Sequence, residues 1–434
     1  MAKSTVDDTS KAPNPVSFGE AFRYWLKLGF VSFGGPAGQI SMMHHDLVEK
    51  HRWISEHRFL HALNYCMVLP GPEAIQLAIY IGWLMHGVLG GLIAGILFLL
   101  PSLALLISLS WVYLVFGDVP SVAGVLYGIK PAVTAIVVFA AYRIGSKALK
   151  NGVLWGLAAA AFVAIFAFDV PFPLIVLAAA LLGYVGGQVL PDKFKSGGGH
   201  GAAGKGYGPA LIDDHTPVPE HARFQWPRVL MFLVVGVALW LVTMAVLYGQ
   251  GGWQGTLTQM GWFFTKAAFL TIGGAYAVLP YVYQGGVEHY GWLTALQMID
   301  GLALGETTPG PLIMVVTYVG YIGGWTKQVF GPEQLALSGL AGAMVATFFT
   351  FLPSFLFILI GGPAIEASRH DIKLSAPLTA ITAAVVGVII NLAVFFAWHV
   401  LWPQGFSGSF DAASLLLMVT AAVALVRYKR GVIE

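Results

Sequence analysis

The sequence contains one pattern of chemical groups twice, and this repeat decides the fold. The first copy reads Lys27-Leu-Gly-Phe-Val-Ser-Phe-Gly34-Gly35, followed by Trp53-Ile-Ser and Pro70-Gly71-Pro72. The second reads Lys266-Ala-Ala-Phe-Leu-Thr-Ile-Gly273-Gly274, followed by Trp292-Leu-Thr and Pro309-Gly310-Pro311, at a constant offset of 239 residues. A duplicated membrane unit with helix breakers at matched places is typical of secondary transporters, whose binding sites lie at those breaks.

The composition predicts an all-α polytopic membrane protein. Of the 434 residues, 57% are hydrophobic and only 10% are charged, whereas a soluble domain has roughly 25% charged residues. About twelve apolar segments are long enough to be membrane-spanning candidates; they are 20–41, 59–86, 88–117, 121–147, 152–169, 172–190, 228–250, 258–282, 294–322, 334–361, 376–400 and 411–428. Basic residues are scattered, which argues against nucleic-acid binding.

Three regions follow from the apolar pattern. Residues 1–191 form a first membrane repeat, 192–226 a polar linker, and 227–434 an extra helix plus the second repeat. If every segment crosses and the N-terminus is cytoplasmic, 15 loop Lys and Arg residues lie inside and four lie outside, which the positive-inside rule favours. Both termini and the linker are then cytoplasmic. Seven crossings separate the two repeats, so we expect them to be inverted.

The Pro-Gly-Pro triplets predict breaks inside the membrane. Two prolines remove two N–H donors, and glycine permits any turn. Pro72 and Pro311 suit the start of a new half-helix, whose N-terminal amides and dipole attract anions. The double glycines form the second break of each half; the alternative there is close helix packing. We expect an anion site at these breaks, which contain Gly34, Gly35, Gly71, Pro72, Gly273, Gly274, Gly310 and Pro311.

Two matched lysines are the candidate cations of this site. Lys27 and Lys266 each lie seven residues before a double glycine, and Ser32 and Thr271 offer hydroxyl groups two residues before it. The alternative is a lysine that extends its ammonium group to the membrane interface. Lys266 lies deeper in apolar sequence, where a charge needs a partner or an anionic ligand.

Three acids within the apolar segments are candidate proton carriers. Glu306 is the first candidate, Asp300 the second and Glu73 the third, because an acid in an apolar site can take up a proton near neutral pH. Glu73 has a simpler interpretation, since it follows Pro72 and complements a helix N-terminus. His57 and His61 have the i, i+4 spacing of a metal pair, but charged neighbours favour a solvated stretch. We expect no metal and no cofactor.

The chain resembles the chromate ion transporter family over nearly its whole length. The matching stretches are Phe30-Val-Ser-Phe-Gly-Gly-Pro36, Arg52-Trp-Ile-Ser55, Leu69-Pro-Gly-Pro72, Gln76-Leu-Ala-Ile-Tyr-Ile-Gly82, Leu100-Pro-Ser102, Ile272-Gly-Gly-Ala-Tyr276, Gly291-Trp-Leu-Thr294, Asp300-Gly-Leu-Ala-Leu-Gly305 and Thr308-Pro-Gly-Pro311. Two residues depart from the pattern. Glu73 stands where a small or hydroxyl residue is expected, and Glu306 where glutamine is expected.

The resemblance implies a long, two-domain bacterial member that exports chromate across the inner membrane, driven by the proton motive force. Its partners would be chromate or a related oxyanion, protons and the lipid bilayer, with a homodimer as an open alternative. The residues alone indicate an anion transporter; they do not separate chromate from sulfate, because selectivity is a difference of affinities. An anion channel of the same architecture is another alternative. An intramembrane enzyme would need a nucleophile with a base, or a metal triad, and the sequence offers neither, so we expect no enzymatic activity.

Overall fold

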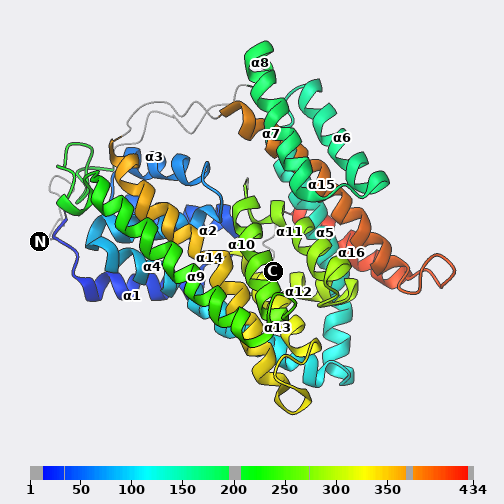
Figure 1. Ribbon diagram of the computed structural model, residues 1–434. Helices are drawn as coiled ribbons and strands as arrows, with labels where there is room; N and C mark the ends of the chain where they lie inside the picture. Colours follow the sequence, from blue (N-terminus) through cyan, green and yellow to red (C-terminus); the bar gives the residue numbers. More distant parts are fainter. Residues whose placement is uncertain (1–12, 34, 195–206, 273, 368–374, 429–434) are drawn as a thin grey trace, which may run out of the picture.

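The computed structural model describes residues 13–33, 35–194, 207–272, 274–367 and 375–428. Within these ranges the protein consists of helices and the loops that connect them (Figure 1). No strand occurs in these ranges, and a single β-bridge joins Ile54 and Ile212. Six helices are long and apolar enough to cross a membrane. They are α4 (Glu73–Phe116), α5 (Pro120–Ala148), α7 (Phe172–Val189), α9 (Trp226–Gly251), α14 (Leu335–Ala367) and α15 (Ser375–Leu401). The protein is therefore a multi-pass all-α membrane protein, as predicted.

Shorter helices occupy the two repeated stretches. The first half contains α1 (Phe18–Val31), α2 (Gly35–Met43), the π-helix η1 (His44–Lys50) and α3 (Glu56–Cys66). The second contains α10 (Thr256–Leu270), α11 (Ala275–Tyr283), the π-helix η3 (Gln284–His289), α12 (Ala295–Thr307), the 3₁₀ turn η4 (Leu312–Met314) and α13 (Val315–Thr326). The longest of these, α10, has 15 residues. The predicted segments 20–41, 59–86, 258–282 and 294–322 are thus each divided in two.

After each Pro-Gly-Pro triplet a short helix packs against the long helix that follows it. In the first half this short helix is the part of α4 before residue 86, and in the second half it is α13. Helix α4 is kinked at His86 and Gly87, where the backbone leaves the helical region. The kink brings Gly82 against the backbone of Gly90, and in the second half Gly320 of α13 lies against Gly342 of α14 in the same way. Only glycine permits this approach, so both hairpins depend on small residues in contact.

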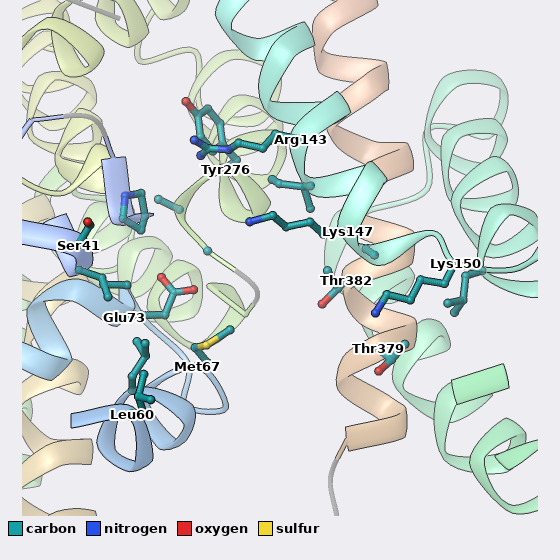
Figure 2. Close-up of a pocket in the computed structure, with 18 of the residues that line it drawn as sticks. Ser41, Leu60, Met67, Glu73, Arg143, Lys147, Lys150, Tyr276, Thr379 and Thr382 are labelled. Carbon is teal, nitrogen blue, oxygen red and sulfur yellow. The ribbon is translucent and has the colours of Figure 1, made fainter. Parts of the chain in front are cut away.

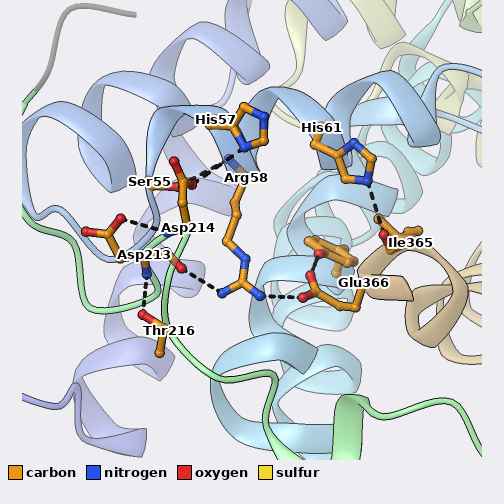
Figure 3. A network of polar contacts seen from close by, with 10 residues as sticks. Ser55, His57, Arg58, His61, Asp213, Asp214, Thr216, Ile365 and Glu366 are labelled. Carbon is orange, nitrogen blue, oxygen red and sulfur yellow. Dashed lines mark hydrogen bonds and ion pairs between the residues drawn. The ribbon is translucent and has the colours of Figure 1, made fainter. Parts of the chain in front are cut away.

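The structure corrects one part of the predicted topology. Three of the four loop cations expected outside the membrane, Lys50, Arg52 and Arg58, belong to a segment that contacts the linker, which was expected inside. Besides the Ile54–Ile212 bridge, the Ser55 hydroxyl donates to Asp214 (2.6 Å) and the Arg58 guanidinium donates to the Asp213 carbonyl oxygen (3.1 Å), as Figure 3 shows. Helices α1 and α2, with 14 and nine residues, are separated by the break inside segment 20–41, so this segment is not one continuous membrane-spanning helix.

The same face holds a buried polar network that joins α3 to the end of α14. Arg58 forms an ion pair with Glu366 (Figure 3). Glu366 also accepts a hydrogen bond from the Tyr80 hydroxyl. The carbonyl oxygen of Ile365 lies 3.1 Å from the ring Nε2 of His61. The charged ends of α3 and α14 are thereby fixed to the hairpin that follows the first Pro-Gly-Pro.

The remaining helices form a second group beside the broken ones. Helix α15 packs on α5, α6 (Gly152–Phe168) and α7, and α16 (Ala412–Arg427) packs on α5. Figure 1 shows this group, with the short α8 (Pro191–Phe194), to one side of α1, α4, α9 and α14. Helix α9 lies against α14 and α10, and the 3₁₀ turns η2 (Glu220–Ala222) and η5 (Pro332–Gln334) precede α9 and α14.

Candidate functional site

The breaks of the two halves meet and exchange equivalent hydrogen bonds. The amide of Gly71, in the first Pro-Gly-Pro, donates to the carbonyl oxygen of Thr271 in the second half (2.7 Å). The amide of Gly310, in the second Pro-Gly-Pro, donates to the carbonyl oxygen of Ser32 in the first half (2.9 Å). Both glycines have positive φ angles, 120° and 100°, which other residues adopt only with strain. Each half therefore closes the break of the other.

Side chains from matched positions surround this crossing. Ser354 lies beside Gly71, and Ser102 lies beside Gly310; both serines come from the repeated Leu-Pro-Ser stretch. The Gln39 amide donates to the carbonyl oxygens of Gly310 (2.6 Å) and Ser32 (3.2 Å). These contacts satisfy backbone groups that the breaks leave without helical partners.

The crossing still contains unsatisfied polar atoms. The hydroxyl groups of Ser32 and Ser102 are buried without a hydrogen-bond partner, whereas the Thr271 hydroxyl donates to the carbonyl oxygen of Ala267 (2.7 Å). Ser32 and Thr271 were predicted from the sequence, whereas Ser102 and Gln39 were not. The repeat of Leu-Pro-Ser was the signal that would have identified Ser102.

A cavity of 840 Å³ lies between the broken helices and the α5–α15 group (Figure 2). Its first wall contains the starts of α2, α4 and α11, at Pro36, Glu73 and Ala275. Its second wall contains Arg143, Ile144, Lys147, Ala148, Lys150, Asn151, Leu154, Asp192, Lys193, Thr379 and Thr382. Three helix N-termini and a basic wall therefore border one volume, and a helix N-terminus carries about half a positive charge.

The charges of this cavity are unequally distributed. Figure 2 shows Lys147 and Lys150 on one side, Glu73 facing them across the gap, and Arg143 beside Tyr276. With Lys193, four cationic side chains line the cavity, against the carboxyl groups of Glu73 and Asp192. A positive cavity with hydroxyl groups and helix N-termini suits a small anion with several oxygen acceptors.

Comparison with known proteins shows the family of this chain. The family model described as "Chromate transporter" matches residues 19–184 and again residues 258–433. The chain belongs to the chromate transporter family. It is similar to the chromate transport protein of Pseudomonas aeruginosa, with 35% identity over 89% of this chain and 83% of that protein. It is also similar to the chromate transport protein of Cupriavidus metallidurans, with 28% identity over 94% of this chain and 87% of the relative. No solved structure matches the chain.

In this member of the chromate transporter family, the three predicted acids occupy different surroundings. Glu73 lines the cavity. Glu306 accepts a hydrogen bond from the hydroxyl of Tyr276, which itself lines the cavity, and Arg143 is close enough to both to interact electrostatically.

Asp300 belongs to a separate cavity of 550 Å³. There its Oδ2 lies 3.3 Å from the Lys130 ammonium and accepts a hydrogen bond from the Tyr113 hydroxyl (2.9 Å). The structure thus brings Glu73 and Glu306 to the main cavity and places Asp300 in another. No group of three or more metal-ligating side chains occurs in the described ranges, including the region of His57 and His61.

The two predicted lysines lie away from the cavity in this transporter. Both side chains are exposed on the outer surface of the helices, neither lines the 840 Å³ cavity, and the Lys266 ammonium lies 5.6 Å from the centre of the Trp262 ring. Their role in anion binding stays a prediction. Gly35, Gly71, Pro72, Gly274, Gly310 and Pro311 all lie at the breaks as expected, while Gly34 and Gly273 lie outside the described residues. The basic residues of α5 are the ones that sequence reasoning missed.

Proposed function

We propose that this protein transports chromate, or a closely related tetrahedral oxyanion, through the 840 Å³ cavity. The observation that supports this most directly is the set of cations, Arg143, Lys147, Lys150 and Lys193, that faces three helix N-termini across one open volume. Chromate transport proteins are among the relatives that match almost the whole chain. A dianion placed there gains from the ammonium and guanidinium groups and from the helix dipoles together.

The proposed topology has eight crossings and four re-entrant hairpins. The crossing helices are the second part of α4, α5, α6, α7, α9, α14, α15 and α16. The hairpins of the first half, in 18–43 and 56–85, open toward the face that carries the linker, because residues 44–58 contact residues 207–222. Those of the second half, in 256–283 and 295–326, open toward the other face, which makes the two halves an inverted repeat.

Orientation follows from the basic residues once the hairpins are assigned. Lys50, Arg52 and Arg58 join the linker side, so eighteen loop Lys and Arg residues share one face and only Lys327 lies on the other. By the positive-inside rule the linker face is cytoplasmic, and both termini lie there, in the bacterial inner membrane. The basic cavity then opens toward the cytoplasm, which suits loading of an anion for export.

Cysteine labelling tests this topology. Cys66 is buried, so a Cys66→Ala background allows single cysteines to be placed at His45, Gly208 and Gly331. We expect His45→Cys and Gly208→Cys to react from the cytoplasmic side and Gly331→Cys from the opposite side. Reaction of His45→Cys and Gly208→Cys from different sides would contradict the hairpin assignment.

Proton coupling is proposed to use Glu306 through Arg143. Unprotonated Glu306 attracts Arg143, which also lines the cavity, whereas protonation of Glu306 releases the guanidinium for the anion or resets it. The Glu306 carboxylate and the anion then compete for one guanidinium, so protonation of Glu306 and anion binding are coupled. Asp300 and Glu73 are the further candidates for this pathway.

The decisive experiment is chromate uptake into inverted membrane vesicles, with and without an imposed proton gradient. Arg143→Gln and Lys147→Met each remove one cavity cation, and we expect either to reduce uptake at least about tenfold, since a charge-assisted hydrogen bond contributes roughly 1.5–3 kcal/mol. Lys327→Met removes one exposed cation from the opposite face and serves as the control. Wild-type uptake in both cavity variants would refute the proposed site.

A further inference from the structure

We propose that Glu73 makes this cavity select tetrahedral oxyanions that carry a proton, such as hydrogen chromate or hydrogen phosphate, over sulfate. This inference rests on the proposed oxyanion site and adds the residue that determines its selectivity. It concerns a side chain that is not repeated in the other half, because Leu312 stands at the matched position after the second Pro-Gly-Pro.

The carboxylate of Glu73 is the unsatisfied acceptor of the cavity. The residue begins α4 and lines the cavity wall, and its Oε2 atom is buried without a hydrogen-bond partner. Its Oε1 atom faces Gly274, where an added Cβ would lie 3.7 Å from it. Glu306, by contrast, has the Tyr276 hydroxyl as a partner.

Cations face this free acceptor from the opposite wall. Figure 2 shows the Glu73 carboxylate directed into the gap that Lys147 borders on the other side. The titratable and charged groups around Glu73 are Cys66 on α3, His44 on η1, Tyr276 on α11, Arg143 and Lys147 on α5, Lys150 after α5, and Asp192 and Lys193 on α8. An oxyanion bound between the walls would meet donors on one side and the carboxylate on the other.

A carboxylate distinguishes oxyanions that can donate a hydrogen bond from oxyanions that cannot. An ionised carboxylate only accepts hydrogen bonds, and so does sulfate, which carries no proton near neutral pH. Hydrogen phosphate and hydrogen chromate have the same tetrahedral shape but present one O–H group. That O–H can donate to the Glu73 carboxylate while the other oxygens bind Arg143 and Lys147. A site built around a substrate donor rejects an analogue that lacks it, because two acceptors then face each other.

The size of the effect follows from one charge-assisted hydrogen bond. We expect such a bond to favour the protonated oxyanion by about 10- to 150-fold over sulfate. In Glu73→Gln the amide can donate to any oxyanion oxygen, so the preference should shrink or reverse. In Glu73→Asp the carboxylate is retained, so the order of preference should survive even if binding weakens.

The test is competition against labelled chromate in proteoliposomes, with inorganic phosphate and sulfate as the competitors at fixed pH. In the wild type we expect phosphate to inhibit uptake at concentrations at least about tenfold lower than sulfate. Glu73→Gln should lower the inhibitory sulfate concentration at least about tenfold, while Glu73→Asp keeps the wild-type ratio.

Three results would overturn the inference. They are equal inhibition of the wild type by sulfate and phosphate, an unchanged ratio in Glu73→Gln, and stronger sulfate inhibition of the wild type as the pH falls from 8 to 6. The last would mean that a protonated Glu73 donates to a dianion. Each leaves chromate uptake and its dependence on Arg143 and Lys147 intact, whereas failure of the proposed function removes that uptake itself.

Discussion

The crossing of the two halves predicts which glycine is paired with which serine. We consider Gly71→Ala and Gly310→Ala, which add a single methyl group to the two Pro-Gly-Pro triplets. An added Cβ at Gly71 would lie 2.5 Å from the Ser354 Oγ and 2.5 Å from the Gln76 Nε2, and one at Gly310 would lie 2.7 Å from the Ser102 Cβ. The two serine contacts join a break in one half to a long helix of the other half.

Two effects lower the free energy of unfolding of each alanine variant. A residue other than glycine at φ angles of 120° or 100° costs about 1–3 kcal/mol of backbone strain. Overpacking against the serine costs about 1–3 kcal/mol more. We therefore expect a loss of about 2–6 kcal/mol in the free energy of unfolding for each variant. Replacing the paired serine by glycine removes the overpacking against that serine and leaves the backbone strain, and in Gly71→Ala the contact with Gln76 also remains.

Double-mutant cycles separate these terms. We expect Gly71→Ala with Ser354→Gly, and Gly310→Ala with Ser102→Gly, to recover about 1–3 kcal/mol relative to additivity. The crossed combinations, Gly71→Ala with Ser102→Gly and Gly310→Ala with Ser354→Gly, serve as controls and should be additive within about 0.5 kcal/mol. The assay is unfolding in mixed micelles titrated with SDS. Equal coupling in matched and crossed pairs, or additivity in all four, would refute the interlocked arrangement.

Two further predictions concern residues outside the cavity. Since Lys27 and Lys266 are exposed, Lys→Met at both positions separates the two site hypotheses in the vesicle uptake assay: loss of chromate uptake in both would favour the sequence-based site, and retention would favour the cavity of α5. In the loop before α16, the Ser414 backbone amide and then the Tyr127 hydroxyl hold the pKa of Asp411 below its usual range. A lowered pKa in the folded state stabilises the protein above the unfolded value of about 3.9 and loses that contribution as the pH falls through the folded value. Asp411→Ala should therefore lower the melting temperature at pH 7, and this difference from the wild type should shrink as the pH falls from about 5 to 3; a difference that is constant with pH would contradict the assignment.

The repeat located the helix breaks but could not give their direction. A fixed offset predicted breaks near residues 34, 71, 273 and 310, and the helices do end or begin at these places. An apolar segment such as 20–41, however, has the same hydropathy whether its two parts continue across the bilayer or fold back on each other. The difference lies in contacts with distant residues, here between Ile54 and Ile212, and no local pattern encodes them.

The sequence predicted those parts of the candidate site whose residues are unusual in a membrane segment. A proline triplet or an acid in apolar sequence is costly unless it has a role, and Glu73 and Glu306 do lie at or beside the cavity. Arg143 and Lys147 are not unusual in this sense, because basic residues are common at the cytoplasmic ends of membrane helices. Their position opposite Glu73 depends on how α5 packs against the broken helices, which spacing along the chain does not reveal.

The two halves repeat the same order of helices but not the same charged residues, and this difference bears on the direction of transport. Helix α5 carries Lys130, Arg143 and Lys147, whereas α15, which follows α14 as α5 follows α4, contains no Lys, Arg, Asp or Glu. The main cavity is lined by four cations and two carboxylates, while the cavity at the other end of α5 is lined by Lys130 with Asp118 and Asp300. An inverted repeat can expose one site to either face, but here an anion would meet a net positive cavity on the proposed cytoplasmic face and a net negative one on the other. Capture is favoured on the first face and release on the second, since fixed charge sets the local anion concentration. The charge distribution therefore supports the proposed export of the oxyanion.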